Sequence, residues 1–252
     1  MHSTTRQALT KVPEVTLVFW LIKIGATTLG ETAGDAVSMS MQLGYLAGTA
    51  IFAAVFVIAV MAQIRARGFH PALYWTTIIA TTTVGTTLAD FADRSLGIGY
   101  AGGSLLLLAL LAASLLLWRA TLGTVAVRSI ASPKAEMFYW ATIMFSQTLG
   151  TALGDWTADT AGLGYTGGAL IFSLLLAALV VAYRTTRVSR TALFWSAFIL
   201  TRPLGAVVGD FLDKPLSQGG LDLSRYSASA ALIGTIVMLI LVFPQRAART
   251  GH

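Results

Sequence analysis

One pattern occurs four times along the chain, and this repetition limits the possible folds more than any other feature. Each copy is marked by a tryptophan, and a glycine, a small residue and an aspartate follow it by 10, 14 and 15 residues. A threonine at offset 8 and a tyrosine at offset 25 complete the pattern. The tryptophans are Trp20, Trp75, Trp140 and Trp195, the aspartates are Asp35, Asp90, Asp155 and Asp210, and the tyrosines are Tyr45, Tyr100, Tyr165 and, six residues late, Tyr226. Recurrence at so many offsets indicates internal duplication.

Apolar residues are spread along the whole chain. Hydrophobic residues make up 56% of the 252 residues and charged residues 11%, whereas about a quarter of an average soluble domain is charged. A membrane-spanning helix needs roughly 20 mostly apolar residues. Eight segments meet this requirement, at about 15–37, 43–63, 72–92, 99–118, 136–158, 163–183, 191–212 and 226–244. The sequence therefore predicts an all-α polytopic membrane protein with eight transmembrane helices.

The basic residues predict the orientation. Of the 17 lysines and arginines, 12 lie in the terminal segments or in alternate loops on one side of the predicted spans. The positive-inside rule places that side, and both termini, in the cytoplasm. The net charge of +6 is explained by these loops, so we expect no nucleic-acid partner. We expect residues 1–14 to form a cytoplasmic segment, residues 15–245 a single membrane domain and residues 246–252 a cytoplasmic tail.

The four copies cover about residues 15–68, 70–123, 135–188 and 190–245. Each copy contains two predicted spans. All four helical hairpins then share one orientation, so their pseudo-symmetry axis lies along the membrane normal. We expect the first helix of each copy, which carries the repeated polar residues, to face the axis, and the second to form an outer ring. The tryptophans and tyrosines at the hairpin ends are expected to lie in interfacial aromatic belts.

The pattern resembles a known family. An aromatic pair opens each copy, at Phe19-Trp20, Tyr74-Trp75, Tyr139-Trp140 and Phe194-Trp195, and the Thr, Gly and Asp positions follow it. This arrangement resembles the bacterial integral membrane proteins built from the DUF347 repeat, over residues 15–245. The resemblance implies a multi-pass protein of the bacterial inner membrane. It implies no activity, because that family is named for its unknown function. The fourth copy departs from the pattern at Pro203 and over residues 218–222.

The four aspartates are the main candidates for a functional site. An ionised carboxylate inside a spanning helix costs at least ~2.5–3.5 kcal/mol at the bilayer centre, and a position near a helix C-terminus adds an unfavourable dipole. Each aspartate therefore needs a partner, which could be a backbone amide, a bound cation, a proton or one of four basic side chains: Arg94, Arg202, Lys214 and Arg225. We expect the four aspartates to converge on a cavity open to the outside.

Other polar residues share the aspartate face of the first helices. Glu31 lies one turn before Asp35, so two neighbouring carboxylates could hold a proton. The repeated threonines, Thr28, Thr83 and Thr148, fall within roughly 20° of the aspartate of their copy on a helical wheel. Their hydroxyls could bind a cation or could donate to the preceding helical turn.

Small residues and two isolated cations occupy other positions. The glycines Gly30, Gly34, Gly85, Gly150, Gly154, Gly205 and Gly209 predict close helix packing, either inside the bundle or between subunits. Lys23 is expected to extend to the inner interface. Arg202 lies deeper and is the candidate charge partner of an aspartate from another copy, or part of an anion site.

Three functional hypotheses follow. Carboxylate and hydroxyl oxygens, in a chain without cysteine, suit protons or hard cations, so the first hypothesis is a small-cation or proton-coupled transporter or channel. The second is a non-transporting membrane scaffold or sensor in which the aspartates join the hairpins. The third, an intramembrane enzyme, has only Glu31 and Asp35 as an acid–base pair, so we expect no enzymatic activity and no cofactor. The expected partners are the lipid bilayer and a small cation or proton.

Overall fold

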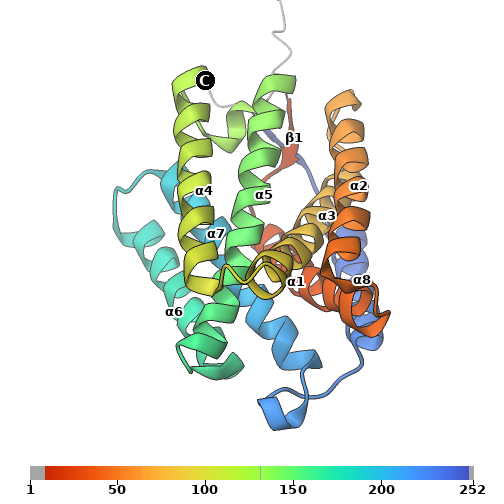
Figure 1. The fold of residues 1–252 in the computed structure, drawn as a ribbon. Coiled ribbons are helices and arrows are strands. Elements are labelled where there is room, and N and C mark those ends of the chain that lie inside the picture. The colour runs from red at the N-terminus through yellow and green to blue at the C-terminus, as the bar shows by residue number, and fades with distance from the viewer. Residues whose placement is uncertain (1–8, 131, 250–252) are drawn as a thin grey trace, which may run out of the picture.

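A computed structural model describes residues 9–130 and 132–249 of the chain, and within this part the chain forms eight long α-helices (Figure 1). Their bounds are α1 Leu17–Asp35, α2 Gly44–Arg65, α3 Pro71–Asp90, α4 Tyr100–Leu122, α5 Pro133–Asp155, α6 Gly164–Thr185, α7 Arg190–Asp213 and α8 Arg225–Val242. Each helix corresponds to one predicted apolar segment. The protein is therefore all-α, and each repeat supplies two helices.

The helices form an inner ring and an outer layer. The inner helices α1, α3, α5 and α7 are neighbours in that order, and α7 packs against α1 to close the ring. Each outer helix packs mainly on the inner helix of the following copy: α2 on α3, α4 on α5, α6 on α7 and α8 on α1. Figure 1 shows α4 beside α5 and α2 beside α3. The repeat is thus a hairpin in sequence, whereas in space its outer helix covers the next repeat.

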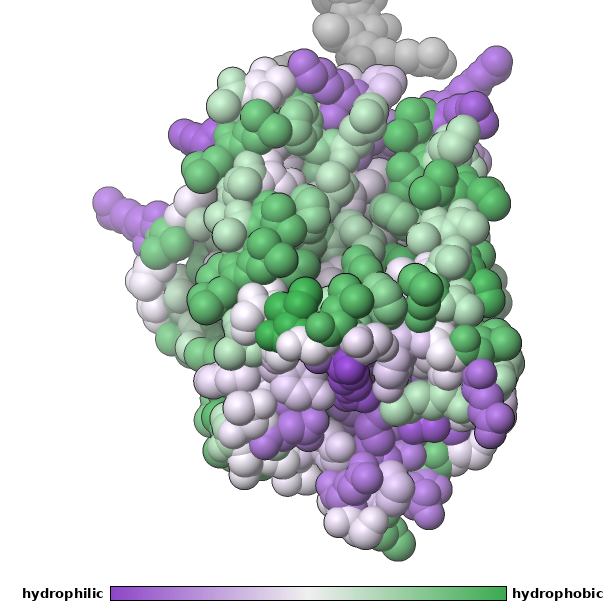
Figure 2. All heavy atoms as spheres, in the orientation of Figure 1, coloured by the Kyte–Doolittle hydropathy of each residue, from purple (hydrophilic) through white to green (hydrophobic). Residues whose placement is uncertain are grey.

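The inner and outer helices differ in how much of their surface is buried. Most residues of α3 and α5 are buried, whereas α2, α4 and α8 expose leucine, isoleucine and valine side chains over most of their length. In Figure 2 apolar side chains form a broad band across the visible face, and polar side chains gather below it. Five helices in the described part, α2, α4, α6, α7 and α8, are long and apolar enough to cross a membrane. These helices indicate a membrane protein. The helices α1, α3 and α5 fall outside this group because their buried faces are polar.

Both described ends of the chain lie at one end of the bundle. Strand β1 (Leu9–Pro13) pairs antiparallel with β2 (Ala247–Arg249). The Lys11 ammonium donates to the Ile64 carbonyl at 2.8 Å and forms an ion pair with Glu136 at 2.7 Å, so β1 is tied to α2 and α5. Residues 1–8 of the predicted N-terminal segment and residues 250–252 of the predicted tail lie outside the described residues.

The repeated aromatic residues close this end of the bundle. Trp75, Trp140 and Trp195 are buried, and the hydroxyls of Tyr74 and Tyr139 share a hydrogen bond of 2.6 Å. The expected interfacial belt is therefore wrong for these residues, because the start of each inner helix faces other helices instead of lipid. Trp195 also donates to the Val125 carbonyl at 2.9 Å, which ties α7 to the segment after α4.

The opposite end has its own repeated geometry. In the first three copies a π-helical turn follows the aspartate directly, at Ala36–Ser40, Phe91–Ser95 and Trp156–Thr160. A glycine with φ between +64° and +76° then begins or directly precedes the outer helix, at Gly44, Gly99 and Gly164. In the fourth copy α7 continues to Asp213, and a short 3-10 helix, Leu216–Gln218, follows. The chain therefore turns back just beyond each aspartate.

Candidate functional site: a buried ring of carboxylates

Glycines let the inner helices approach one another closely all around the ring. At offset 10, each glycine faces the residue at offset 7 of the next copy: Gly30 faces Thr82, Gly85 faces Gln147, Gly150 faces Arg202 and Gly205 faces Thr27. One turn further along, Gly34 faces Thr86, Gly154 faces Ala206 and Gly209 faces Glu31. A Cβ on Gly85 would lie 3.0 Å from the backbone of Gln147. These small faces are used inside the bundle, between helices of one chain.

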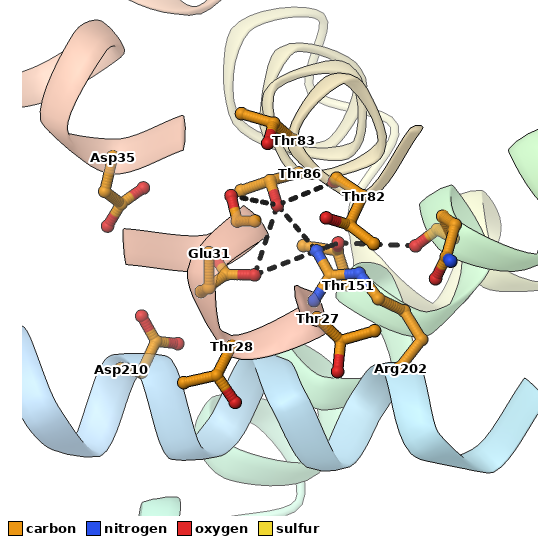
Figure 3. Close-up of polar contacts among 12 residues, drawn as sticks. Thr27, Thr28, Glu31, Asp35, Thr82, Thr83, Thr86, Thr151, Arg202 and Asp210 are labelled. Atoms are coloured by element: carbon orange, nitrogen blue, oxygen red, sulfur yellow. Dashed lines mark hydrogen bonds and ion pairs between the residues drawn. The ribbon is translucent and has the colours of Figure 1, made fainter. Parts of the chain in front are cut away.

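The four repeated aspartates converge at the end of this ring. Their exposed fractions are 1% for Asp35, 1% for Asp90, 2% for Asp155 and 4% for Asp210. Glu31 belongs to two groups of carboxylates, one with Asp35 and Asp90 and the other with Asp155 and Asp210. In each group, one oxygen from each residue lies within 4.8 Å of the others. Figure 3 shows the Glu31 carboxylate between Asp35 and Asp210. Four copies of the repeat therefore build one carboxylate ring.

Two cations bridge the ring in the same way on opposite sides. Arg94 contacts Asp90 of its own copy at 3.2 Å and Asp155 of the next copy at 3.3 Å. Lys214 contacts Asp210 of its own copy at 3.0 Å and Asp35 of the first copy, which follows in the ring, at 2.5 Å. Both cations lie four residues after the aspartate of their copy. The aspartate therefore occurs in all four copies, whereas the bridging cation occurs in the second and fourth copies.

Lys214 is held as a cation by its surroundings. Burial by itself would lower the pKa of the Lys214 ammonium, but the nearby carboxylates of Asp210, Asp35 and Asp213 raise this pKa above its ordinary value. Asp213, the third of these carboxylates, also forms an ion pair with Arg225 at 3.0 Å. Arg225 lies 3.6 Å from Asp35 as well.

Arg202 of α7 lies one layer deeper and contacts side chains of α1, α3 and α5, so its guanidinium lies on the axis of the ring. Figure 3 shows it beside Glu31 and Thr151. Its Nη2 atom donates to Glu31 at 3.0 Å, to the Thr86 hydroxyl at 2.6 Å and to the Thr151 hydroxyl. The sequence allows two roles for Arg202, the charge partner of an aspartate from another copy or part of an anion site; its carboxylate partner is instead Glu31 of the first copy. Arg202 lies two turns before Asp210, and its side chain spans only the one turn that separates it from the layer of Glu31, Thr86 and Thr151.

Lys23 is buried instead of extending to the interface. Its side chain is 0% exposed, and its ammonium lies 4.2 Å from the centre of the Phe198 ring. The predicted position at the inner interface is therefore wrong. Lys23 follows Trp20 by three residues. The residues at this offset in the other copies, Ile78, Ile143 and Phe198, are also fully buried, so this position of the repeat faces the axis.

The threonine hydroxyls divide into two groups. Thr28, Thr83 and Thr148 donate to carbonyls one turn earlier in their own helices, at 3.0, 2.8 and 3.0 Å. The hydroxyls on the axial ion pair belong to Thr86 and Thr151 at offset 11, which sequence reasoning missed. A signal was present, because offset 11 holds Glu31, Thr86 and Thr151 in three of the four copies.

A cavity of 560 Å³ lies at the mouth of the ring. Its lining includes the residue four positions after every repeated aspartate, namely Met39, Arg94, Asp159 and Lys214, together with Arg225. The pseudo-symmetry axis therefore runs through this cavity. Arg94 and Lys214 reach both the cavity and the ring, so the carboxylates lie behind a layer of cations. The four repeated aspartates converge behind this cavity instead of lining it, and the charged residues of its lining are Arg94, Lys214, Arg225 and Asp159.

The site holds more carboxylates than cations. In the ion-pair network, six buried carboxylates, Glu31, Asp35, Asp90, Asp155, Asp210 and Asp213, contact four cations, Arg94, Arg202, Lys214 and Arg225. The buried Lys23 ammonium is not part of this network, because it has no hydrogen-bond partner among the described residues. Asp90 lies 3.2 Å from Arg94, but neither of its buried oxygens accepts a hydrogen bond from the described residues. A buried carboxylate that lacks hydrogen-bond donors is unfavourable as an anion even beside one cation. The excess of two negative charges therefore calls for protons or a bound cation.

The repeats match a known family. The family described as "Repeat of Unknown Function (DUF347)" matches at residues 18–69, 73–124, 138–189 and 193–247. Neither a curated protein nor a solved structure matches the chain. The four matched stretches each contain one inner and one outer helix.

Proposed function

The chain belongs to the DUF347 repeat family, and we propose that it is an eight-span membrane transporter or channel that moves protons or small hard cations through its carboxylate ring. The observation that carries this proposal is the convergence of Glu31 with all four repeated aspartates in two groups whose oxygens lie within 4.8 Å. Intramembrane carboxylates that face a bundle interior mark ion or proton pathways in membrane proteins. On this proposal α1, α3 and α5 span the membrane despite their polar faces, because the outer helices separate them from lipid.

The ligand set favours hard cations. The ring offers only oxygen atoms, from carboxylates and from the Thr86 and Thr151 hydroxyls, and such ligands suit Mg²⁺, Mn²⁺, Ca²⁺ or protons. The excess of two negative charges matches one divalent cation or two protons. The cavity at the mouth provides access from the side opposite the β1–β2 pair, which we place outside the cell.

A second candidate function is a non-transporting scaffold or sensor. The observation in its favour is that every repeated aspartate already has a fixed cation, either Arg94 or Lys214, within 3.3 Å. On this alternative the two bridges join neighbouring repeats and the ring carries no mobile ion.

Flux measurements separate the two candidates. We expect purified protein in liposomes to conduct Mn²⁺, Ca²⁺ or protons, and we expect Asp90→Asn to reduce that flux at least tenfold. Asp90 is the sharpest target, because Arg94 retains Asp155 as a partner when the Asp90 charge is removed. The matched control is Asp222→Asn, since Asp222 is exposed and its φ of +55° is one that asparagine tolerates.

The result that contradicts transport is the absence of flux above empty liposomes for the whole ion panel, with the wild-type protein correctly inserted. Flux that survives in Asp90→Asn would remove the ring from the pathway. Equal loss in Asp222→Asn would point to damage of the fold.

A further inference from the structure

The fourth copy contains an insertion, and it positions the lysine of the carboxylate ring. Tyr226 comes six residues later than the pattern requires. The added residues fold back on the end of α7, where the Leu221 and Leu223 amides donate to the Phe211 and Leu212 carbonyls at 2.7 and 2.9 Å. The insertion is thus a fixed structure attached to the helix that carries Asp210.

The folded insertion holds Lys214 by its backbone. The Asp222 amide donates to the Lys214 carbonyl at 2.9 Å, and Asp222 adopts φ +55° to do so. Gly220 lies so close to the Lys214 backbone that a Cβ at this position would overlap it. Glycine is therefore required at this close approach, and the start of the Lys214 side chain is fixed before its ammonium reaches the ring.

The ammonium occupies a cage of three carboxylates. Oxygens of Asp35, Asp210 and Asp213 lie within 4.8 Å of one another, and the Lys214 nitrogen contacts the first two at 2.5 and 3.0 Å. All three carboxylates are at least nine-tenths buried. One oxygen of Asp35 and one oxygen of Asp213 are buried without a hydrogen-bond partner among the described residues. The first and third copies have Met39 and Asp159 at the position of Lys214, whereas the second copy has Arg94. A positively charged residue at this position is therefore a property of the second and fourth copies and not of the repeat in general.

We infer that the cage formed by Asp35, Asp210 and Asp213 is a divalent-cation site that the Lys214 ammonium occupies as a tethered competitor. With Lys214 in place, three carboxylates face two cations, Lys214 and Arg225. When the ammonium leaves, the excess becomes two negative charges, which one divalent cation neutralises. The insertion thereby sets how readily a free cation enters the ring. Its physiological meaning rests on the proposed transport function, whereas the cage itself is tested by binding alone.

The experiment measures Mn²⁺ binding to purified full-length protein in detergent, from the loss of the electron paramagnetic resonance signal of free Mn²⁺. We expect Lys214→Met, which copies Met39, to bind one Mn²⁺ per chain at least tenfold more tightly than the wild type. We expect the added Asp35→Asn substitution to abolish this gain. Lys134→Met is the matched control, because Lys134 is exposed. It should leave Mn²⁺ binding unchanged.

The inference is overturned if folded Lys214→Met binds Mn²⁺ no more tightly than Lys134→Met, or if the gain persists with Asp35→Asn. Should Lys214→Met fail to fold, Lys214→Gln removes the charge while keeping a hydrogen-bond donor for Asp35, and the same comparison applies. Tight Mn²⁺ binding by the variant without flux through the wild type would support the cage and contradict transport. Flux through the wild type without tighter Mn²⁺ binding by the variant would support transport and contradict the cage.

Discussion

At the scale of single residues, the axial pair of Arg202 and Glu31 is fully enclosed by the inner helices. Arg202 is fully buried, and one of its nitrogen atoms serves Glu31 and two threonines from three different helices. Removal of one partner from a buried ion pair leaves an uncompensated charge, whereas replacement of both by apolar groups can be nearly neutral. The pair therefore links all four inner helices at one level of the bundle.

We expect Glu31→Gln and Arg202→Met each to lower the free energy of unfolding by about 3–5 kcal/mol. The double variant should lose much less than the sum, because no lone charge remains buried. Thermal unfolding of the four proteins in detergent gives the coupling between the two residues. Strictly additive losses would contradict a direct interaction between them.

Sequence reasoning about single residues succeeded where a position repeats and failed where it does not. Asp35, Asp90, Asp155 and Asp210 share an offset, so their convergence follows from the repeat. Arg202 and Lys23 break the pattern, and their partners depend on how far each side chain reaches between layers. Helix periodicity predicts on which side of its helix a residue lies. It does not predict where that residue lies along the bundle axis relative to residues of neighbouring helices.

At the scale of elements, glycines decide how closely the inner helices pack. Gly154 lies at a close contact between α5 and α7, because a Cβ there would lie 2.9 Å from the Cβ of Ala206 and 3.3 Å from the Pro203 carbonyl oxygen. By contrast, Gly234 on α8 is exposed, and a Cβ added there would meet no neighbouring atom within 4 Å. The two glycines offer a comparison within one protein.

We expect Gly154→Ala to destabilise the protein by about 1–3 kcal/mol, because overpacking forces backbone or side-chain shifts. Gly234→Ala should be neutral or stabilising by up to about 1 kcal/mol, since alanine restricts the unfolded chain and favours the helix. Midpoints of thermal unfolding in the same detergent measure both effects. A similar change in the two variants would show that the α5–α7 contact does not limit stability.

The helices themselves were readily predicted, and their partners were not. Runs of apolar residues locate all eight helices to within a few residues, because length and composition are local properties. The π-helical turns after Asp35, Asp90 and Asp155 were not foreseen, since a change in helical hydrogen bonding has no distinct apolar pattern. The packing of α2 on α3 depends on contacts between copies, which a repeated sequence does not distinguish from contacts within one copy.

At the scale of the whole molecule, the bundle has two different ends. One end carries the β1–β2 pair and the aromatic cluster, and the other carries the carboxylate ring with its cavity. Because the chain has no cysteine, single cysteines can report which end faces which side of the membrane. Ser217 and Thr186 are exposed at opposite ends.

We expect a membrane-impermeant maleimide to label Ser217→Cys in intact cells and to label Thr186→Cys only after permeabilisation. This result would place the ring outside and both described ends of the chain inside, as the positive-inside rule predicts. Labelling of Thr186→Cys alone in intact cells would reverse the orientation. Labelling of both positions from one side would contradict a membrane crossing by α7, the helix that separates them.

The closure of the ring has a consequence for how the protein is made. The outer helix that covers α1 is α8, and the strand that pairs with β1 is β2. Helix α1 must therefore remain uncovered on one side until α8 has been synthesised and inserted. Each later inner helix meets its cover as soon as it emerges, because α2, α4 and α6 precede α3, α5 and α7 in the chain. The ring is therefore complete only after α8 has been made, and a chain truncated before α8 would leave α1 uncovered on that side.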